Sequence, residues 1–231
     1  MARFSGRVVA ITGAAGNLGR AVAGRFAREG GSLVLLDVDA GRVASLAKEL
    51  PGTHRGLGVD LLDTAATRAV IRQAGRIDVA CALAGGFAMG PTVHETDAAI
   101  WERMQQLNVT TLVNLLAAVT PGMIAARSGR IVTVGAHAAL RGVAGMGAYC
   151  ASKAAAMRIT ESAAAELRPL GINVNGVLPT ILDTPENRAA MPDADPAHWV
   201  ALDDLAATIA FLASDDARAV HGALLPVTGL S

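Results

Sequence analysis

The sequence predicts a single α/β domain, with a doubly wound parallel sheet and helices on both of its faces. Short apolar runs alternate with longer helical segments from one end of the 231-residue chain to the other. The short runs are almost continuously apolar, as expected for parallel strands that are covered on both faces. No linker, composition shift or internal repeat divides the chain, so we expect one domain over residues 1–231.

Seven segments have the length and composition of buried strands: Val8–Ile11, Leu33–Asp37, His54–Asp60, Val79–Ala82, Ile131–Val134, Ile172–Leu178 and Leu224–Val227. The segments between them have helical patterns: Leu18–Glu29, Gly41–Leu50, Thr64–Ala74, Ile100–Ala126, Tyr149–Leu167 and Asp203–Ala213. A Pro-rich stretch from Pro179 to Pro196 interrupts the alternation. Because a helix and a strand still follow it, we interpret this stretch as an insertion within the domain.

The composition excludes several classes of protein. Hydrophobic residues make up 52% of the chain and charged residues only 17%, which is atypical of disordered proteins. The 20 basic and 20 acidic residues balance, so we expect no general attraction to nucleic acid or to an anionic membrane. Cys81 and Cys150 have no metal-ligand spacing, which favours reduced thiols in a cytoplasmic protein and no metal site.

The longest uncharged run, Met104 to Ala126, is long enough to span a membrane. It contains Gln105, Asn108 and Asn114, so we expect a helix that is buried against protein instead. The N-terminal segment also lacks the continuous apolar core of a secretory signal, because Gly and Asn interrupt it.

A glycine-rich turn follows the first strand and precedes the first helix. Its sequence, from Thr12 to Gly19, is TGAAGNLG. Glycines permit a tight turn and a close approach of backbone N–H groups to a pyrophosphate, and the helix N-terminus adds partial positive charge. The predicted cofactor contacts in this turn are Gly13, Gly16, Asn17, Leu18 and Gly19.

Acidic residues end the second and third predicted strands. The carboxylate of Asp37 can accept hydrogen bonds from the adenosine ribose and would repel a 2′-phosphate, which favours NADH over NADPH. Arg42 is the main exception to this argument, because an arginine near Asp37 could bind a 2′-phosphate. We expect Arg42 to be solvated on the next helix instead. Asp60 either binds the adenine amino group or caps the helix that follows.

Tyr149 is the only tyrosine in the chain, and it lies four residues before Lys153, one of two lysines. On a helix this spacing places both side chains on one face. A nearby ammonium favours the phenolate, so we expect a lowered pKa for Tyr149, as suits a proton donor in hydride chemistry. An incidental surface pair is the alternative interpretation.

Together these motifs resemble the short-chain dehydrogenase/reductase family over essentially the full chain. The resemblance implies a seven-stranded Rossmann sheet and hydride transfer with a nicotinamide cofactor. It implies that Tyr149 gives or takes the proton, that Lys153 binds the nicotinamide ribose, and that Asn108 holds a water in the proton relay. The further cofactor positions that it implies are Ala84, Gly85, Pro179, Ile181 and Thr184, the last two receiving the nicotinamide carboxamide.

The chain departs from the family pattern at three places. Asn17 replaces the middle glycine of the turn. The sequence Ala-Leu-Ala-Gly at 82–85 replaces Asn-Asn-Ala-Gly and loses an amide that braces the sheet. Ala136 stands at the position of the catalytic serine, which removes one polarising donor for a substrate carbonyl.

Dihydropteridine reductases form a branch of the family that lacks this serine, and the chain resembles them more closely. Residues 81–86, 135–146 and 177–199 carry the resemblance, which implies NADH-dependent reduction of a quinonoid or conjugated imine-like substrate under a lid at about 179–200. His137, Arg141 and Trp199 are candidate substrate contacts beside Ala136. A loop histidine, a solvated arginine and a packed tryptophan explain them equally well.

Two other functions fit the same residues. One is a short-chain carbonyl reductase or alcohol dehydrogenase, in which His137 or water replaces the serine. The other is a catalytically idle NAD(H)-binding redox sensor, against which the retained Tyr149 argues because pure binding does not need it. We expect a small-molecule substrate, and a homodimer or homotetramer paired through the long apolar helices, as is usual in the family.

Overall fold

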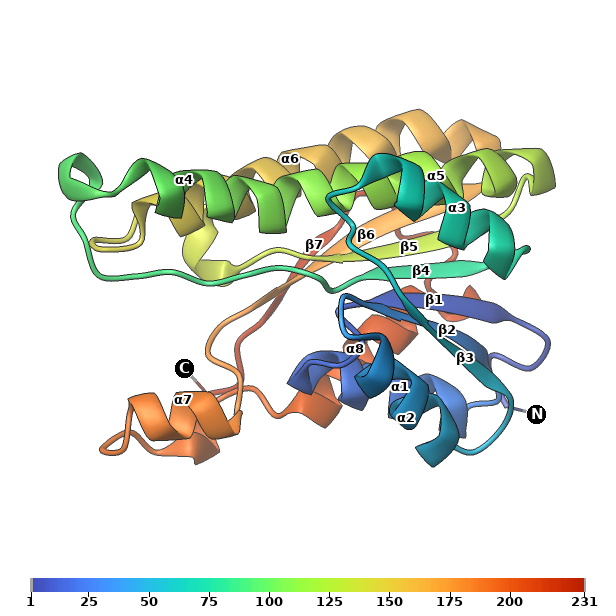
Figure 1. The fold of residues 1–231 in the computed structure, drawn as a ribbon, viewed down its shortest axis with the longest axis horizontal. Coiled ribbons are helices and arrows are strands. Elements are labelled where there is room, and N and C mark those ends of the chain that lie inside the picture. The colour runs from blue at the N-terminus through green and yellow to red at the C-terminus, as the bar shows by residue number, and fades with distance from the viewer. Residues whose placement is uncertain (1, 231) are drawn as a thin grey trace.

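The computed structural model describes residues 2–230, and all seven predicted strands form one parallel sheet in it (Figure 1). The order across the sheet is β3-β2-β1-β4-β5-β6-β7, and every pairing between neighbours is parallel. The strands are β1 (Val8–Thr12), β2 (Ser32–Asp37), β3 (His54–Gly58), β4 (Val79–Ala82), β5 (Gly129–Val134), β6 (Ile172–Pro179) and β7 (Leu224–Val227). The predicted Rossmann sheet is therefore confirmed.

The α-helices connect the strands as the alternation predicts. They are α1 (Asn17–Arg28), α2 (Ala40–Glu49), α3 (Thr64–Ala74), α4 (Ala98–Gln105), α5 (Thr111–Ala126), α6 (Gly147–Leu167), α7 (Pro185–Ala190) and α8 (Leu202–Leu212). The short helix α7 was not predicted, because its sequence, PENRAA, is too short to show an apolar period. It lies in the predicted insertion, apart from the layers that cover the sheet (Figure 1).

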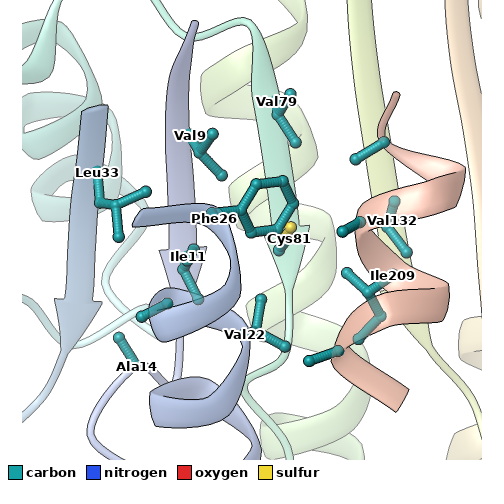
Figure 2. Packing of buried hydrophobic residues seen from close by; sticks show 14 of the residues in the cluster. Val9, Ile11, Ala14, Val22, Phe26, Leu33, Val79, Cys81, Val132 and Ile209 are labelled. Carbon is teal, nitrogen blue, oxygen red and sulfur yellow. The ribbon is translucent and has the colours of Figure 1, made fainter. Parts of the chain in front are cut away.

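Two apolar layers hold the sheet between the helices. On one face, Val22 and Phe26 of α1 and Ile209 of α8 point toward strands β1, β4 and β5 (Figure 2). On the other face, α3, α5 and α6 cover the sheet with side chains such as Leu115 and Met123 (Figure 1). Burial on both faces explains why the strand sequences are nearly all apolar.

The predicted helix over Ile100–Ala126 is a continuous helical run over Ala98–Ala126 that contains one π-helical turn. Among the described residues it is the one helix with the length and composition of a membrane span, but Asn108 and Asn114 are buried against the rest of the protein. Pro121 lies inside α5 without ending it. The π turn, Gln106–Thr110, contains Asn108, and such turns frequently mark functional sites.

The strand order reverses between β1 and β4, because β1 pairs with β2 on one side and with β4 on the other. In open parallel sheets, ligands bind outside the carboxyl ends of the strands at this switch point. The glycine-rich turn after β1 and the Ala84-Gly85 segment after β4 both lie there.

Candidate active site

The glycine-rich turn folds so tightly that two of its glycines cannot be replaced without a clash. Gly13 has a φ of +62°, and a Cβ on it would lie 3.1 Å from the backbone of Ala84. A Cβ on Gly19 would lie 2.2 Å from the carbonyl oxygen of Gly13. The turn therefore packs against α1 through backbone atoms, and its N–H groups can approach a pyrophosphate closely.

Charged side chains bind both backbone polar groups of Ala15, its N–H and its carbonyl. The Ala15 N–H donates to Oδ2 of Asp37 at 3.1 Å, and the Arg42 guanidinium donates to the Ala15 carbonyl at 2.7 Å. Arg42 is exposed on α2, as expected, but the first turn of α2 also brings its guanidinium to the glycine-rich turn, a contact that was not expected. Asp37 and Arg42 therefore stand together at the predicted adenosine ribose position.

A cleft of about 190 Å³ opens between the ends of β1, β2 and β4. Gly13, Asp37, Asp60, Ala84 and Gly85 are among the residues that line it. These five residues were all predicted as cofactor contacts, and the structure brings them together. The cleft and the glycine-rich turn beside it suit the adenosine and pyrophosphate portion of a dinucleotide.

Asp60 does not cap the helix that follows it, since the carboxylate of Asp63 accepts the Ala65 and Ala66 N–H groups at the start of α3. Asp60 instead accepts the Leu62 N–H at 2.9 Å in the preceding turn. Because Asp60 also lines the cleft, its position agrees with the adenine-binding interpretation rather than with the capping one.

Thr12 replaces the bracing amide that the Ala-Leu-Ala-Gly segment lacks. Its buried hydroxyl accepts the N–H groups of Leu83, at 3.0 Å, and of Ala84, at 3.1 Å. Sequence reasoning missed this role, although a threonine at the end of a buried strand is a detectable signal. The hydroxyl ties β1 to the segment after β4 and thereby shapes the cleft.

Tyr149 and Lys153 lie in the first turns of α6, as predicted. Lys153 is buried, and its Nζ donates to the carbonyl of Val134 at 2.8 Å. Burial lowers the pKa of Lys153 to about 8 and raises the pKa of Tyr149 to about 12. The expected lowering of the Tyr149 pKa was therefore wrong for this structure, because desolvation of the phenol outweighs the attraction of an ammonium bound to Val134.

Asn108 joins the catalytic helix to the segment after β4. Its Oδ1 accepts the Gly86 N–H at 2.9 Å, while its Nδ2 donates to the Gly86 carbonyl at 3.1 Å and to Ser152 Oγ at 3.0 Å. The Ser152 hydroxyl in turn donates to the Tyr149 carbonyl at 2.8 Å. A Cβ on Gly85 would lie 2.7 Å from Asn108 Oδ1 and 3.3 Å from Lys153 Nζ, so glycine is needed there.

The four candidate substrate residues differ in their surroundings. Ala136 is buried in a small apolar cluster with Met157 and Leu178, against which Tyr149 packs, so apolar atoms surround the position of the family serine. His137 is half-buried and Arg141 is exposed in the loop that follows. Trp199 is buried, which favours a packing role over a lid that covers substrate.

The predicted lid contains the three remaining cofactor positions. Pro179 ends β6, the Ile181 carbonyl accepts the Val200 N–H at 2.9 Å, and the Thr184 hydroxyl caps α7 by accepting the Asn187 N–H. Asn17, at the start of α1, donates to the Glu186 carboxylate of α7 at 2.6 Å. The lid is thus attached to the glycine-rich turn, with Ile181 and Thr184 between the turn and β6.

A family model described as short chain dehydrogenase matches residues 7–195. The chain belongs to this family. The short-chain dehydrogenase is 36% identical over 241 residues to cis-4-hydroxycyclohexanecarboxylate dehydrogenase of Sinomonas cyclohexanicum, covering 98% of this chain and 96% of that protein. It is 33% identical over 248 residues to 2-(S)-hydroxypropyl-CoM dehydrogenase 3 of Xanthobacter autotrophicus, covering 98% and 97%.

The fold of this short-chain dehydrogenase is similar to that of NAD⁺-bound xylitol dehydrogenase. The TM-score is 0.90 at 28% identity, and the match covers 98% of this chain and 99% of that one. The chain is thus an NAD(P)-dependent oxidoreductase with a Rossmann fold. The nicotinamide cofactor would supply or accept the hydride when it is bound.

Proposed function

We propose that this short-chain dehydrogenase interconverts a secondary alcohol and a ketone with NAD(H). The observation that carries the proposal is the arrangement of Tyr149, Lys153 and Asn108 beside a cleft that fits a dinucleotide. The alcohol and polyol dehydrogenases described above support this reaction class rather than pterin reduction.

In the reducing direction, the half-buried hydroxyl of Tyr149 donates its proton to the carbonyl oxygen as that oxygen gains electron density. In the oxidising direction, the same oxygen takes the proton of the alcohol while the C–H hydrogen leaves as hydride to the cofactor. The raised pKa of Tyr149 keeps the hydroxyl protonated near neutral pH, which favours the reducing direction. Lys153 ties this helix to the end of β5, and Asn108 ties it to the segment after β4.

Reduction of a quinonoid substrate is the second candidate function. Ala136 favours it, because an electron-poor ring needs a proton donor but little polarisation of a carbonyl. Hydride transfer to such a ring uses the same Tyr149 hydroxyl, so the two candidates differ in substrate and share the proton donor.

For the cofactor we propose NADH in preference to NADPH. Asp37 places a carboxylate at the predicted ribose position, where it would accept hydrogen bonds from hydroxyls and repel a phosphate. Arg42 stands beside it, but its guanidinium is engaged by the Ala15 carbonyl, and this reduces the attraction it offers to a 2′-phosphate.

A turnover assay with NADH and NADPH tests these proposals. Cyclic and acyclic ketones, a quinone and quinonoid dihydropterin are the substrates to compare, with the corresponding alcohols and NAD⁺ in the reverse direction. We expect turnover of a ketone with NADH. Turnover confined to the quinone or the dihydropterin would favour reduction of a quinonoid substrate. Tight NADH binding without any turnover would contradict both candidate functions.

We also propose a homodimer or homotetramer in which α5 and α6 pair with a second copy. A groove of about 430 Å³ runs between these helices, lined by apolar side chains such as Val113, Leu116 and Ile159. Pairing would cover this groove and the exposed side chain of Val113. Light scattering that shows a monomer would contradict it.

A further inference from the structure

Two loops border the substrate side of Tyr149. One follows β4, over residues 83–92, and the other follows β5, over residues 135–146. The Gly90 N–H donates to the Gly145 carbonyl at 2.9 Å, which ties the loops together. The residues that directly follow the two loops also meet, because a Cβ on Gly147 would lie 2.8 Å from the side chain of Val93. We call the surface formed by these two loops the rim.

Large apolar side chains are exposed on the rim. Phe87 is 60% exposed, Met89 61% and Leu140 54%. The Phe87 ring meets the Tyr149 ring edge to face, with the centroids 4.9 Å apart. Exposed apolar surface that adjoins a catalytic side chain indicates a ligand that covers it.

Polar side chains are scarce on the rim. Between residues 83 and 92 the only polar side chain is Thr92, and none is charged. Between residues 135 and 146 the polar side chains are His137 and Arg141. Ala136, in the apolar cluster against which Tyr149 packs, offers no hydroxyl where the family has a serine. A polyol would therefore lose hydration of several hydroxyls without gaining hydrogen-bond partners, and each unpaired hydroxyl costs affinity.

We propose that the rim selects an apolar carbocyclic ketone or secondary alcohol and discriminates against acyclic polyols. The proposal rests on the function proposed above and names the substrate class of the same site. A flat or puckered ring can pack on the exposed Phe87 side chain next to Tyr149, because aromatic rings bind apolar rings through a large contact area. Tyr149 then gives its proton to the carbonyl oxygen on the ring, or takes the proton of the corresponding hydroxyl group.

The test compares kcat/KM for cyclohexanone and cyclohexanol with kcat/KM for xylitol, using NAD(H) and the whole protein. We expect the cyclic pair to be preferred by roughly 10²-fold or more. Phe87→Ala should raise KM for cyclohexanone roughly tenfold and change kcat less, since the ring contributes binding and not the proton. Phe211→Ala is the matched control, because Phe211 is a 40% exposed phenylalanine on α8, which covers the other face of the sheet.

Each outcome separates the substrate class from the reaction. Equal or better turnover of xylitol would overturn the apolar substrate class and leave the alcohol–ketone reaction in place. An unchanged KM in Phe87→Ala, or the same rise in Phe211→Ala, would also overturn the role of the rim. If no ketone or alcohol is turned over although NADH binds, the proposed function itself fails, and the substrate class fails with it.

Discussion

The cofactor end and the substrate end of this site are built in different ways. At the cofactor end, polar groups are already hydrogen-bonded to one another: Asp37 binds the Ala15 N–H, Arg42 binds the Ala15 carbonyl, and Thr12 binds the segment after β4. At the substrate end, Tyr149 is surrounded by Phe87 and by the apolar cluster around Ala136. Polar partners are plentiful at one end and scarce at the other.

This difference separates what the fold provides from what individual side chains provide. The cofactor end is formed largely by backbone at the carboxyl edge of the sheet, so every sequence that folds this way offers it. The substrate end depends on a few side chains from two loops, and these can change without loss of the sheet. Binding of cofactor and choice of substrate should therefore respond separately to mutation.

Replacing the one hydroxyl at the substrate end should have the largest effect. Tyr149→Phe removes the proton donor and should lower kcat roughly 10²- to 10⁴-fold. The dissociation constant for NADH, measured by fluorescence titration, should change little, because Tyr149 is not among the predicted cofactor contacts. A joint loss of turnover and NADH binding would show that the two ends are not separate.

Restoring the serine hydroxyl that Ala136 lacks should increase activity. Ala136→Ser adds a donor beside Tyr149 and should raise kcat on simple ketones by up to roughly 10²-fold, the lower end of the range known for single oxyanion donors. Ala139→Ser is the matched control in the same buried cluster, and it should change kcat little. No gain in Ala136→Ser would favour a quinonoid substrate, which needs no such donor.

The pH dependence should differ between the two directions of the reaction. Burial raises the pKa of Tyr149 to about 12, so the phenolate that alcohol oxidation needs grows as pH rises. Between pH 6 and 8, below the pKa of about 8 for Lys153, kcat/KM for oxidation should rise roughly tenfold per pH unit. Ketone reduction should stay nearly flat over that range. A flat oxidation profile would show that the bound cofactor lowers the pKa of Tyr149.

Smaller effects are expected from the charged pair at the cofactor end. Asp37→Ala should reduce the preference for NADH over NADPH and Arg42→Ala should increase it, each by roughly three- to tenfold in the ratio of dissociation constants. Arg20→Ala serves as the control, because Arg20 is a surface arginine of α1 whose guanidinium pairs with Glu49. Ratios that stay constant in both variants would remove this pair from cofactor selection.

The smallest effect, on stability, should come from the brace between β1 and the segment after β4. Thr12→Val leaves the Leu83 and Ala84 N–H groups without an acceptor and should cost about 1–3 kcal/mol of unfolding free energy. Thermal unfolding should then shift down by roughly 2–4 °C per kcal/mol, while Thr12→Ser, which keeps the hydroxyl, should not shift it. An unchanged melting temperature in Thr12→Val would contradict the brace.

Most of the fold was predictable because its signals are local. Continuously apolar runs mark strands covered on both faces, and all seven were found within a few residues of their observed ends. Gly13, Asp37, Tyr149 and Lys153 were also found, since each belongs to a motif with fixed spacing. Helix α7 was missed, because one and a half turns in a Pro-rich segment leave no periodic pattern.

The contacts that the sequence did not predict are those between residues that are distant in the chain. Arg42 was expected in solvent, yet α2 brings it to Ala15, 27 residues earlier. Thr12 has partners that lie 71 and 72 residues later. The direction of the Tyr149 pKa shift depends on burial and on where the Lys153 ammonium points, neither of which spacing reveals.

The amino-acid order by itself determined the alternation of strands and helices, the position of the glycine-rich turn and the pairing of Tyr149 with Lys153 on one helix. These depend on composition and spacing within a few turns of chain. Only the tertiary structure decided that Asp37 and Arg42 both bind the backbone of Ala15, that burial raises the pKa of Tyr149, and that the Phe87 ring packs against the Tyr149 ring. Contacts across the sheet edge create these features, and desolvation by segments far apart in sequence sets their chemistry.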